Sequence, residues 1–362
     1  MAIVTSYPGV YIQEDDSPVV SIHHGATAVP VFILEDNDPL ALAKMCMVTS
    51  WFDYVTTVRQ VTNQDIDLDN NLRDINTKAY FECGGGRCYF ISNDHGDELI
   101  PQYDDITLVV NGLGPDFKPD VFDINPLCQP GTGRFGLLSG PSSKLTSDYD
   151  PAGDYSSNPC VAVYYPWLTA SWTSQKISPA VVMAGIYCAN DRQYGVWKAP
   201  ANIALPTGYQ PCYLISDGLQ GQFNSGLAIN MIRTFPHRGT VVWGARTLED
   251  SDNWRYIPVR RLFDSAERDI KAMMNTLMFE PNTQPTWVKA GTAINNYLYG
   301  LWCQGALQGN TEQDAYYVQI GIGTTMTDDD INQGKMIVKV AMAPVKPAEF
   351  IILQFTQQVD TQ

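Results

Sequence analysis

The residues from which a catalytic site could be built are few in this chain of 362 residues. A serine or cysteine nucleophile needs a histidine beside it that a carboxylate holds in place. Of the four histidines, His23 and His24 follow an extended N-terminal segment where we expect no rigid support. His95 and His237 lie in sequences typical of turns, Asn93-Asp94-His95-Gly96-Asp97 and Phe235-Pro236-His237-Arg238-Gly239. The histidines therefore indicate no catalytic device.

Other motifs that carry chemistry are also missing. The chain has no Gly-x-Ser-x-Gly elbow, no His-Glu-x-x-His pair and no phosphate loop ending in Gly-Lys-Ser/Thr. Cys83 and Cys88 flank residues 84–86, three glycines, without the histidine or second cysteine pair that a zinc site needs. A phosphate-binding loop follows a strand and opens a helix, and here we expect the reverse order. We predict no cofactor, no metal and no enzymatic activity.

Composition limits the partners. The net charge of −16 argues against nucleic acid, which requires a basic face. No apolar run reaches the roughly 18 residues of a membrane span, and no signal peptide begins the chain. We therefore predict no membrane insertion, and either synthesis and folding in the cytoplasm or export by a route without a signal peptide. The eight cysteines form no Cys-x-x-Cys pair and are predicted to be buried free thiols.

The first half of the chain gives uneven structural signals. Residues 26–34 are apolar and contain Pro30, which fits the start of a strand or an edge strand. Apolar positions at helical spacing from Leu72 to Cys83 predict a helix that Gly84 ends, followed by a strand. Residues 112–176 are rich in Gly, Pro, Ser and Asp and suggest long loops on an exposed domain. Residues 178–187 are a buried helix or strand, and the pattern does not separate the two.

The second half is more regular. Residues 259–277 predict a helix with one apolar stripe and a charged face that includes Arg260 and Arg261, and a second helix runs from Pro285 to Trp302. Alternation predicts strands at residues 316–322 and 337–340. Between them, Thr327 or Asp328 is expected to cap a short helix ending near Gly334. The run Asp328, Asp329 and Asp330 lacks the spacing of a calcium loop and is interpreted as a solvated or partner-facing helix start.

Both ends of the chain are extended apolar segments bounded by proline. The first is Tyr7-Pro8-Gly9-Val10-Tyr11-Ile12, and the second runs from Pro344 to Phe355 and contains Phe350, Ile351, Ile352, Leu353 and Phe355. A terminal strand without a partner in its own chain commonly adds to the sheet edge of another molecule. Pairing within the domain is the alternative, and the pattern alone does not decide between them.

These segments resemble the tail sheath proteins of contractile injection systems, and most closely the sheaths of extracellular phage-tail-like particles of the antifeeding-prophage and virulence-cassette kind. The resemblance covers both termini and most of residues 180–355. His237 stands where a glycine is more usual. The segments between the termini that match the family are Gly185-Ile186-Tyr187, Gly195-Val196-Trp197-Lys198-Ala199-Pro200-Ala201-Asn202, Arg238-Gly239-Thr240-Val241-Val242-Trp243-Gly244-Ala245-Arg246-Thr247-Leu248, Trp254-Arg255-Tyr256-Ile257-Pro258-Val259-Arg260-Arg261-Leu262-Phe263 and Phe279-Glu280-Pro281-Asn282, together with residues 81–91.

The resemblance implies a mixed α/β (α+β) tail-sheath fold and a non-enzymatic sheath subunit. Such subunits stack as hexameric rings in a helix around an inner tube, and contraction drives the tube through a target envelope. The implied partners are further copies of the chain, the tube protein, baseplate and terminator or cap proteins, and paralogous sheath subunits, in a particle released extracellularly. We expect an N-terminal arm (residues 1–25), an inserted outer domain (26–235), a C-terminal inner domain (236–344) and a C-terminal arm (345–362).

The tube-facing residues are a separate hypothesis. A sheath must be templated by its tube and later release it, which favours a polar contact. The candidates are Asp328, Asp329 and Asp330 with Lys335, and secondly Arg260 and Arg261. A secreted hydrolase or carbohydrate-binding module is the alternative function, suggested by the loop-rich middle and the aromatic residues.

Overall fold

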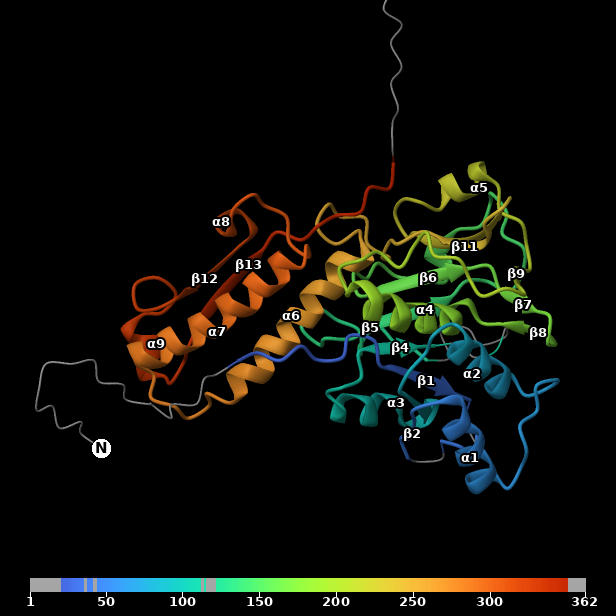
Figure 1. The fold of residues 1–362 in the computed structure, drawn as a ribbon, viewed down its shortest axis with the longest axis horizontal. Coiled ribbons are helices and arrows are strands. Elements are labelled where there is room, and N and C mark those ends of the chain that lie inside the picture. The colour runs from blue at the N-terminus through green and yellow to red at the C-terminus, as the bar shows by residue number, and fades with distance from the viewer. Residues whose placement is uncertain (1–20, 36–37, 42–43, 112–113, 115–121, 351–362) are drawn as a thin grey trace, which may run out of the picture.

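The computed structural model describes residues 21–35, 38–41, 44–111, 114 and 122–350. Figure 1 shows two lobes, one built on a large sheet and the other on the long helices α6 and α7, with α6 leading from one into the other. The elements of the first lobe are β1 (Pro30–Leu34), β2 (Cys46–Val48), α1 (Trp51–Thr62), α2 (Leu72–Glu82), β3 (Cys88–Ser92), α3 (Asn93–Leu99), η1 (Ile100–Gln102), β4 (Leu108–Val110), β5 (Phe135–Ser139), η2 (Pro151–Gly153), β6 (Val161–Tyr165), β7 (Leu168–Ala170), β8 (Thr173–Ile177), α4 (Pro179–Tyr194), β9 (Tyr209–Pro211), α5 (Asp217–Gln222), β10 (Ile229–Phe235) and β11 (Gly239–Trp243). Those of the second are α6 (Ile257–Asn275), α7 (Gln284–Cys303), α8 (Glu312–Ala315), β12 (Tyr316–Ile320), α9 (Asp328–Asn332) and β13 (Val338–Met342).

The large sheet has the strand order β11-β10-β6-β5-β4-β1-β3-β2. Its six inner strands are parallel, and an antiparallel strand closes each edge. Pro30 is the first residue of β1, so the predicted strand start is confirmed. The alternative of an edge strand is wrong, because β1 pairs with β3 on one side and β4 on the other.

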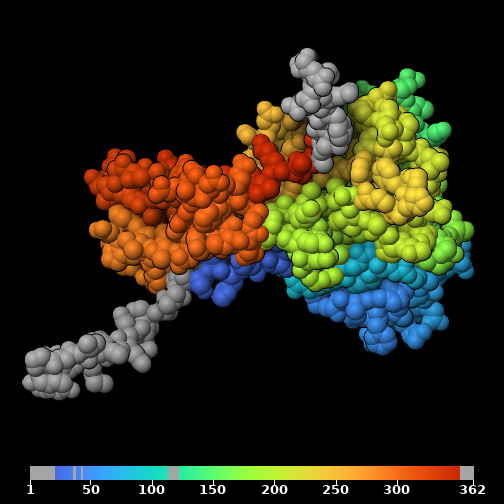
Figure 2. All heavy atoms as spheres, turned by 45° about the horizontal axis from the view of Figure 1, so that its top comes forward, coloured from blue at the N-terminus to red at the C-terminus, as the bar shows by residue number. Residues whose placement is uncertain are grey.

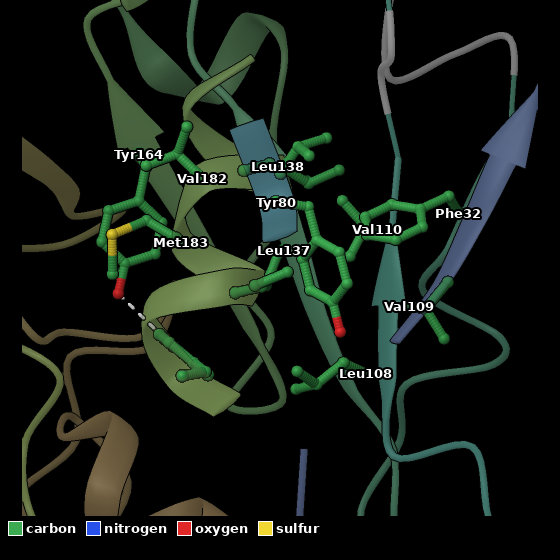
Figure 3. Close-up of a cluster of buried hydrophobic side chains, with 14 of the residues drawn as sticks. Phe32, Tyr80, Leu108, Val109, Val110, Leu137, Leu138, Tyr164, Val182 and Met183 are labelled. Carbon is green, nitrogen blue, oxygen red and sulfur yellow. Dashed lines mark hydrogen bonds between the residues drawn. The ribbon is translucent and has the colours of Figure 1, made fainter. Parts of the chain in front are cut away.

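The undecided segment 178–187 is helical. The Ser178 hydroxyl accepts the amide of Val181, and Pro179 occupies the first turn of α4, where its missing N–H costs nothing. Most of α4 is buried, as expected of a helix that is apolar all round. It covers the sheet at β4 to β6 and packs against α2, and Figure 3 shows side chains of α2 and α4 meeting those of the central strands.

The expectation of long loops over residues 112–176 is correct for residues 122–134 and 140–160, where the one described element is η2, and wrong for residues 135–139 and 161–176. This stretch contains β5 and β6, adjacent inner strands of the large sheet, and β7 and β8 of a three-stranded antiparallel sheet with the order β8-β7-β9. Parallel strands are buried on both faces and show no apolar–polar alternation, so the pattern concealed them. Gly136 lies inside β5, at a position where a larger residue would not fit. A Cβ there would come within 2.4 Å of the Ile124 side chain.

The regular segments fold as expected. The predicted helices α2, α6 and α7 are confirmed, as are the left-handed Gly84 (φ +96°) that follows α2 and the strand β3 after it. β12 and β13 form the predicted antiparallel pair. Thr327 caps α9, and its capping box with Asp330 closes the helix start.

Each lobe has its own hydrophobic cluster. The first extends from Val29 to Ile257. The second joins α6, α7 and the β12–β13 pair, and Val196 of the segment after α4 also belongs to it. The large sheet continues through β11, past the boundary expected at residue 235. The lobes are thus held together by packing as well as by the continuous chain.

Candidate functional site

The structure overturns two of the expectations about the histidines. His95 lies in α3, so the predicted turn is wrong, whereas His237 occupies a turn with φ +64° as predicted. The expectation that nothing holds His24 is also wrong, because its ring lies 4.9 Å from that of Tyr297. Within the described ranges, no group of three or more His, Cys, Asp and Glu residues could hold a metal ion.

The cysteines and the helices complete the chemical survey. All eight cysteines are free thiols, and burial raises the pKa of Cys83, Cys88 and Cys128. The prediction that every thiol is buried is wrong at Cys303, which is exposed, and at Cys46, which is half-buried, as is Cys212. Among the helices that the structure describes, none is long and apolar enough to cross a membrane.

The basic face expected at Arg260 and Arg261 does not exist as a surface. The two side chains are 2% and 3% exposed. Arg260 pairs with Asp264 at 2.7 Å and lies over the Trp254 ring. Arg261 binds Asp191 of α4 at 2.6 Å. Charged side chains are buried when paired, so these arginines are unavailable to an external partner. The Arg260 pair lies within α6, whereas the Arg261 pair joins α6 to the first lobe.

The acidic helix start is exposed as expected. Asp328 and Asp329 are exposed and Asp330 is half-buried. The Thr327 amide and hydroxyl donate to the Asp330 carboxylate and hold the pKa of Asp330 below its usual range. Lys335 is exposed one turn beyond α9, and its carbonyl accepts the Asn282 side-chain amide. Asp328, Asp329 and Lys335 thus form a charged surface on a helix whose position is well defined.

The second lobe also has an incomplete sheet. In the described part of the chain, β12 and β13 pair only with each other, so each has one edge without a strand partner. A hollow of about 720 Å³ lies between α7 and β12, lined among others by Trp287, Val288, Gly291, Val318, Ile320 and Ile322. Val288 and Ile322 are more than half exposed. Such an edge beside a groove with both apolar and polar lining suits an added extended segment, whose backbone pairs with the strand and whose side chains enter the groove.

The terminal segments are only partly described. Tyr7, Pro8, Gly9, Val10, Tyr11 and Ile12 lie outside the described residues, as do Ile351, Ile352, Leu353 and Phe355. Phe350 is 71% exposed. Within the described tail, the Val345 amide donates to the Ala306 carbonyl and Glu349 binds Arg246, so residues 345–349 contact their own chain.

Sequence reasoning missed the open hairpin and the groove. The alternation of residues 316–322 predicted a strand, but a strand pattern does not tell how many partners the strand has. The signal available was the pair of apolar terminal segments, for which the sequence shows no alternating partner strand beside them.

Comparisons with known proteins agree with this geometry. A family described as the phage tail sheath C-terminal domain matches residues 249–358. A sheath complex of the extracellular contractile injection system PVC, in the contracted state, is 49% identical over 99% of each chain, with a TM-score of 0.87. The contracted helical sheath of the anti-feeding prophage is 42% identical over 98% of this chain and all of that one, with a TM-score of 0.80.

A more distant structure shares the fold alone. The sheath tail protein from Desulfitobacterium hafniense is 10% identical over 93% of this chain and 100% of that one, with a TM-score of 0.60. The comparison with curated proteins finds no match.

Proposed function

The chain belongs to the phage tail sheath family and is a sheath subunit of a contractile, phage-tail-like particle, and we propose that it assembles by lending its terminal arms to neighbouring copies. Its subunits would stack as hexameric rings in a helix around an inner tube. Interfaces between unlike surfaces that do not close on themselves produce such open helical assemblies. Contraction of the sheath would drive the tube through a target envelope.

The observation that carries the proposal is the β12–β13 pair, whose two outer edges have no strand partner among the described residues. An isolated two-stranded sheet is marginally stable in water, whereas added strands satisfy its outer backbone groups. Each subunit has two apolar terminal segments to give, and the described part of the chain offers two open strand edges to fill. Residues 1–21 and the tail beyond residue 349 are the proposed donors, and residues 344–349 are the intramolecular base of that tail.

The arrangement of the lobes follows from the same proposal. The lobe of α6 to β13 would be the inner part, which carries the strand exchange and faces the tube through Asp328, Asp329 and Lys335. The lobe of the large sheet would be the outer part, and we propose the boundary between the two parts after β11, the last strand of that sheet along the chain. The tube, baseplate and cap proteins and paralogous sheath subunits are proposed partners. Cytoplasmic synthesis, extracellular release and the absence of catalysis are likewise part of the proposal. The hydrolase or carbohydrate-binding alternative finds no support in the comparisons.

Deleting Met1 to Ser17 tests the strand exchange. The truncated chain should remain folded, with the far-ultraviolet circular dichroism and melting temperature of the full chain, because both hydrophobic clusters lie within residues 22–342. It should form no cylinders by negative-stain electron microscopy.

The matched control keeps the arm but removes charge from it. The double variant Asp15→Asn, Asp16→Asn should still assemble, because the apolar segment from Tyr7 to Ile12 is unchanged. Cylinders of normal length from the truncated chain would show that the N-terminal arm is not exchanged.

A further inference from the structure

We infer that α6 and the residues leading into it hold the bases of both terminal arms at two separate points, with Asp269 and Arg246 as the positioning residues. The N-terminal base is residues 22–27 and the C-terminal base is residues 344–349. This inference rests on the proposed strand exchange, because it concerns how the arms leave the subunit.

The N-terminal base is hydrogen-bonded to three residues of α6, namely Asp269, Arg268 and Arg261. The Gly25 amide donates to the Asp269 carboxylate at 3.1 Å. The Ala26 carbonyl accepts from Arg268 at 3.0 Å. Asp269 is buried, and its other oxygen accepts the Tyr297 hydroxyl at 2.9 Å, which fixes the carboxylate between α6 and α7.

The next residue extends the contact toward the first lobe. The Thr27 carbonyl accepts from Arg261 at 2.9 Å, and the Thr27 hydroxyl donates to Asp191 at 2.6 Å. Arg261 and Asp191 are themselves a buried ion pair. The side of the base nearer the terminus is held by packing, since Ile22 contacts the second hydrophobic cluster and the His24 ring lies tilted against the Tyr297 ring.

The C-terminal base is held at the other end of α6. Arg246 binds Glu349 through both its Nε and its Nη2, the latter at 2.6 Å, and is itself 8% exposed. Such a forked ion pair fixes orientation as well as distance. Arg246 forms a β-bridge with Tyr256, the N-cap residue of α6, and Lys346 donates to the Asp252 carbonyl at 2.8 Å.

These contacts set the spacing of the two arms. Asp269 lies 13 residues after Tyr256 (269 − 256), which is roughly 20 Å along a helix. Figure 2 shows the blue N-terminal residues along the underside of the second lobe, running toward the first, and red C-terminal residues at the junction of the lobes on the opposite side.

A fixed spacing matters for strand exchange. A slip of one residue turns the side chains of an added strand to the wrong face, so the arm must arrive in register. Ordering the base within the free subunit reduces the entropy that is lost when the arm binds. When a neighbouring subunit moves, a fixed arm base also transmits the displacement of the arm to α6, whereas a flexible base would absorb it.

The test uses the full chain with one variant at each base. Glu349→Ala removes the carboxylate that Arg246 binds. Gly25→Ala places a Cβ 3.0 Å from the Asp269 carboxylate and displaces the N-terminal base without altering α6. The matched controls are Glu98→Ala, an exposed glutamate of α3, and Gly153→Ala, where a Cβ meets no atom within 4 Å.

The measurements are the critical concentration for sheath assembly, by sedimentation, and the melting temperature of the unassembled chain. Each base variant should raise the critical concentration about tenfold, the effect of losing one charge-assisted contact, at an unchanged melting temperature. Glu349→Gln, which keeps one hydrogen bond, should fall between Glu349→Ala and the parent chain. The controls should assemble like the parent.

The outcomes separate this inference from the proposed function. Assembly of both base variants at the parent concentration would overturn it, and so would a fall in melting temperature that accounts for the lost assembly, because the contacts would then be structural only. If deletion of Met1 to Ser17 blocks assembly while the base variants assemble normally, only the positioning role is wrong. Normal assembly of the deletion variant would instead contradict strand exchange itself.

Discussion

At the scale of single residues, several charged side chains of α6 are buried and bind groups inside the protein. Arg260, Arg261 and Asp269 each bond a group outside their own helical turn or stack on an aromatic ring, and all three are buried. A long side chain can reach a partner that its place on the helical wheel does not reveal. Residue type alone therefore predicted a basic surface at Arg260 and Arg261 that does not exist. In the structure, Arg261 joins the two lobes and Asp269 holds the base of the N-terminal arm.

His237 adopts a backbone conformation that disfavours most side chains. Its φ of +64° lies in the left-handed region and the residue is exposed, so its side chain gains little there. His237→Gly should raise the free energy of unfolding by up to about 1 kcal/mol, since the left-handed strain of about 1–2 kcal/mol exceeds the entropic cost of glycine. Urea denaturation measures the change.

The matched control is His95→Gly in α3, where the backbone is helical. Glycine in that helix should lower the free energy of unfolding by about 1 kcal/mol. A loss of stability of the same size at position 237 would contradict the strain argument.

Asp264 predicts a specific pH dependence. Burial raises the pKa of this carboxyl to about 6, although Arg260 opposes the shift. Because the folded pKa exceeds that of the unfolded chain, the stabilising contribution of Asp264 is complete below pH 4 and is lost as the pH rises through 6. Comparing urea denaturation of the parent chain and of Asp264→Asn from pH 4 to 7 isolates this group.

The expected result is a difference in free energy of unfolding, parent minus variant, that falls as the pH rises from 4 to 6 and then stays constant. A difference that grows with pH would mean that pairing with Arg260 outweighs burial.

At the scale of elements, the close crossing of α2 and α4 supports the central sheet. Gly185 of α4 lies against α2, where a Cβ would come within 2.5 Å of the Tyr80 carbonyl and 2.9 Å of the Cys83 Cβ. The carbonyl belongs to the helix backbone and cannot rotate away. The two helices can therefore cover the parallel strands only with glycine at this crossing.

Gly185→Ala should push α2 from α4 and reduce the free energy of unfolding by about 1–3 kcal/mol, as overpacking does. Urea denaturation followed by tryptophan fluorescence measures the loss. Gly218→Ala in α5, where a Cβ meets no atom within 4 Å, is the control and should be neutral or slightly stabilising. Equal stability of the two variants would show that the crossing can adapt.

At the scale of the whole molecule, the two lobes suit motion between subunits more than motion within them. Each lobe has a packed cluster, and buried ion pairs such as Arg261 with Asp191 connect them. Packed interiors resist continuous deformation, whereas exposed polar surfaces can exchange partners. Contraction is therefore expected to rearrange the surfaces between subunits and to leave each lobe nearly unchanged.

The charged surface at α9 carries a prediction at this scale. Asp329→Lys should reduce the amount of tube that co-sediments with the sheath by roughly fivefold or more, because a reversed charge is repeated in every subunit of the assembly. The control Asp148→Lys makes the same charge change on an exposed residue of the first lobe. An unchanged tube yield from Asp329→Lys would remove α9 from the tube interface.

Local signals in the sequence determined the elements of the second lobe. The apolar stripe of α6, the alternation of β12 and β13 and the Thr327 cap depend on residues a few positions apart, and each was predicted within a few residues. The motifs spread over residues 180–355 identified the family on the same basis.

Only the tertiary structure decided where these elements face and what they pair with. It made residues 178–187 a helix, moved β1 from an edge to the middle of the sheet and buried Arg260 and Arg261. It also left β12 and β13 with open edges. Each of these outcomes depends on contacts between residues far apart in the chain, such as Arg261 with Asp191, and a pattern of neighbouring residues contains no information about such partners.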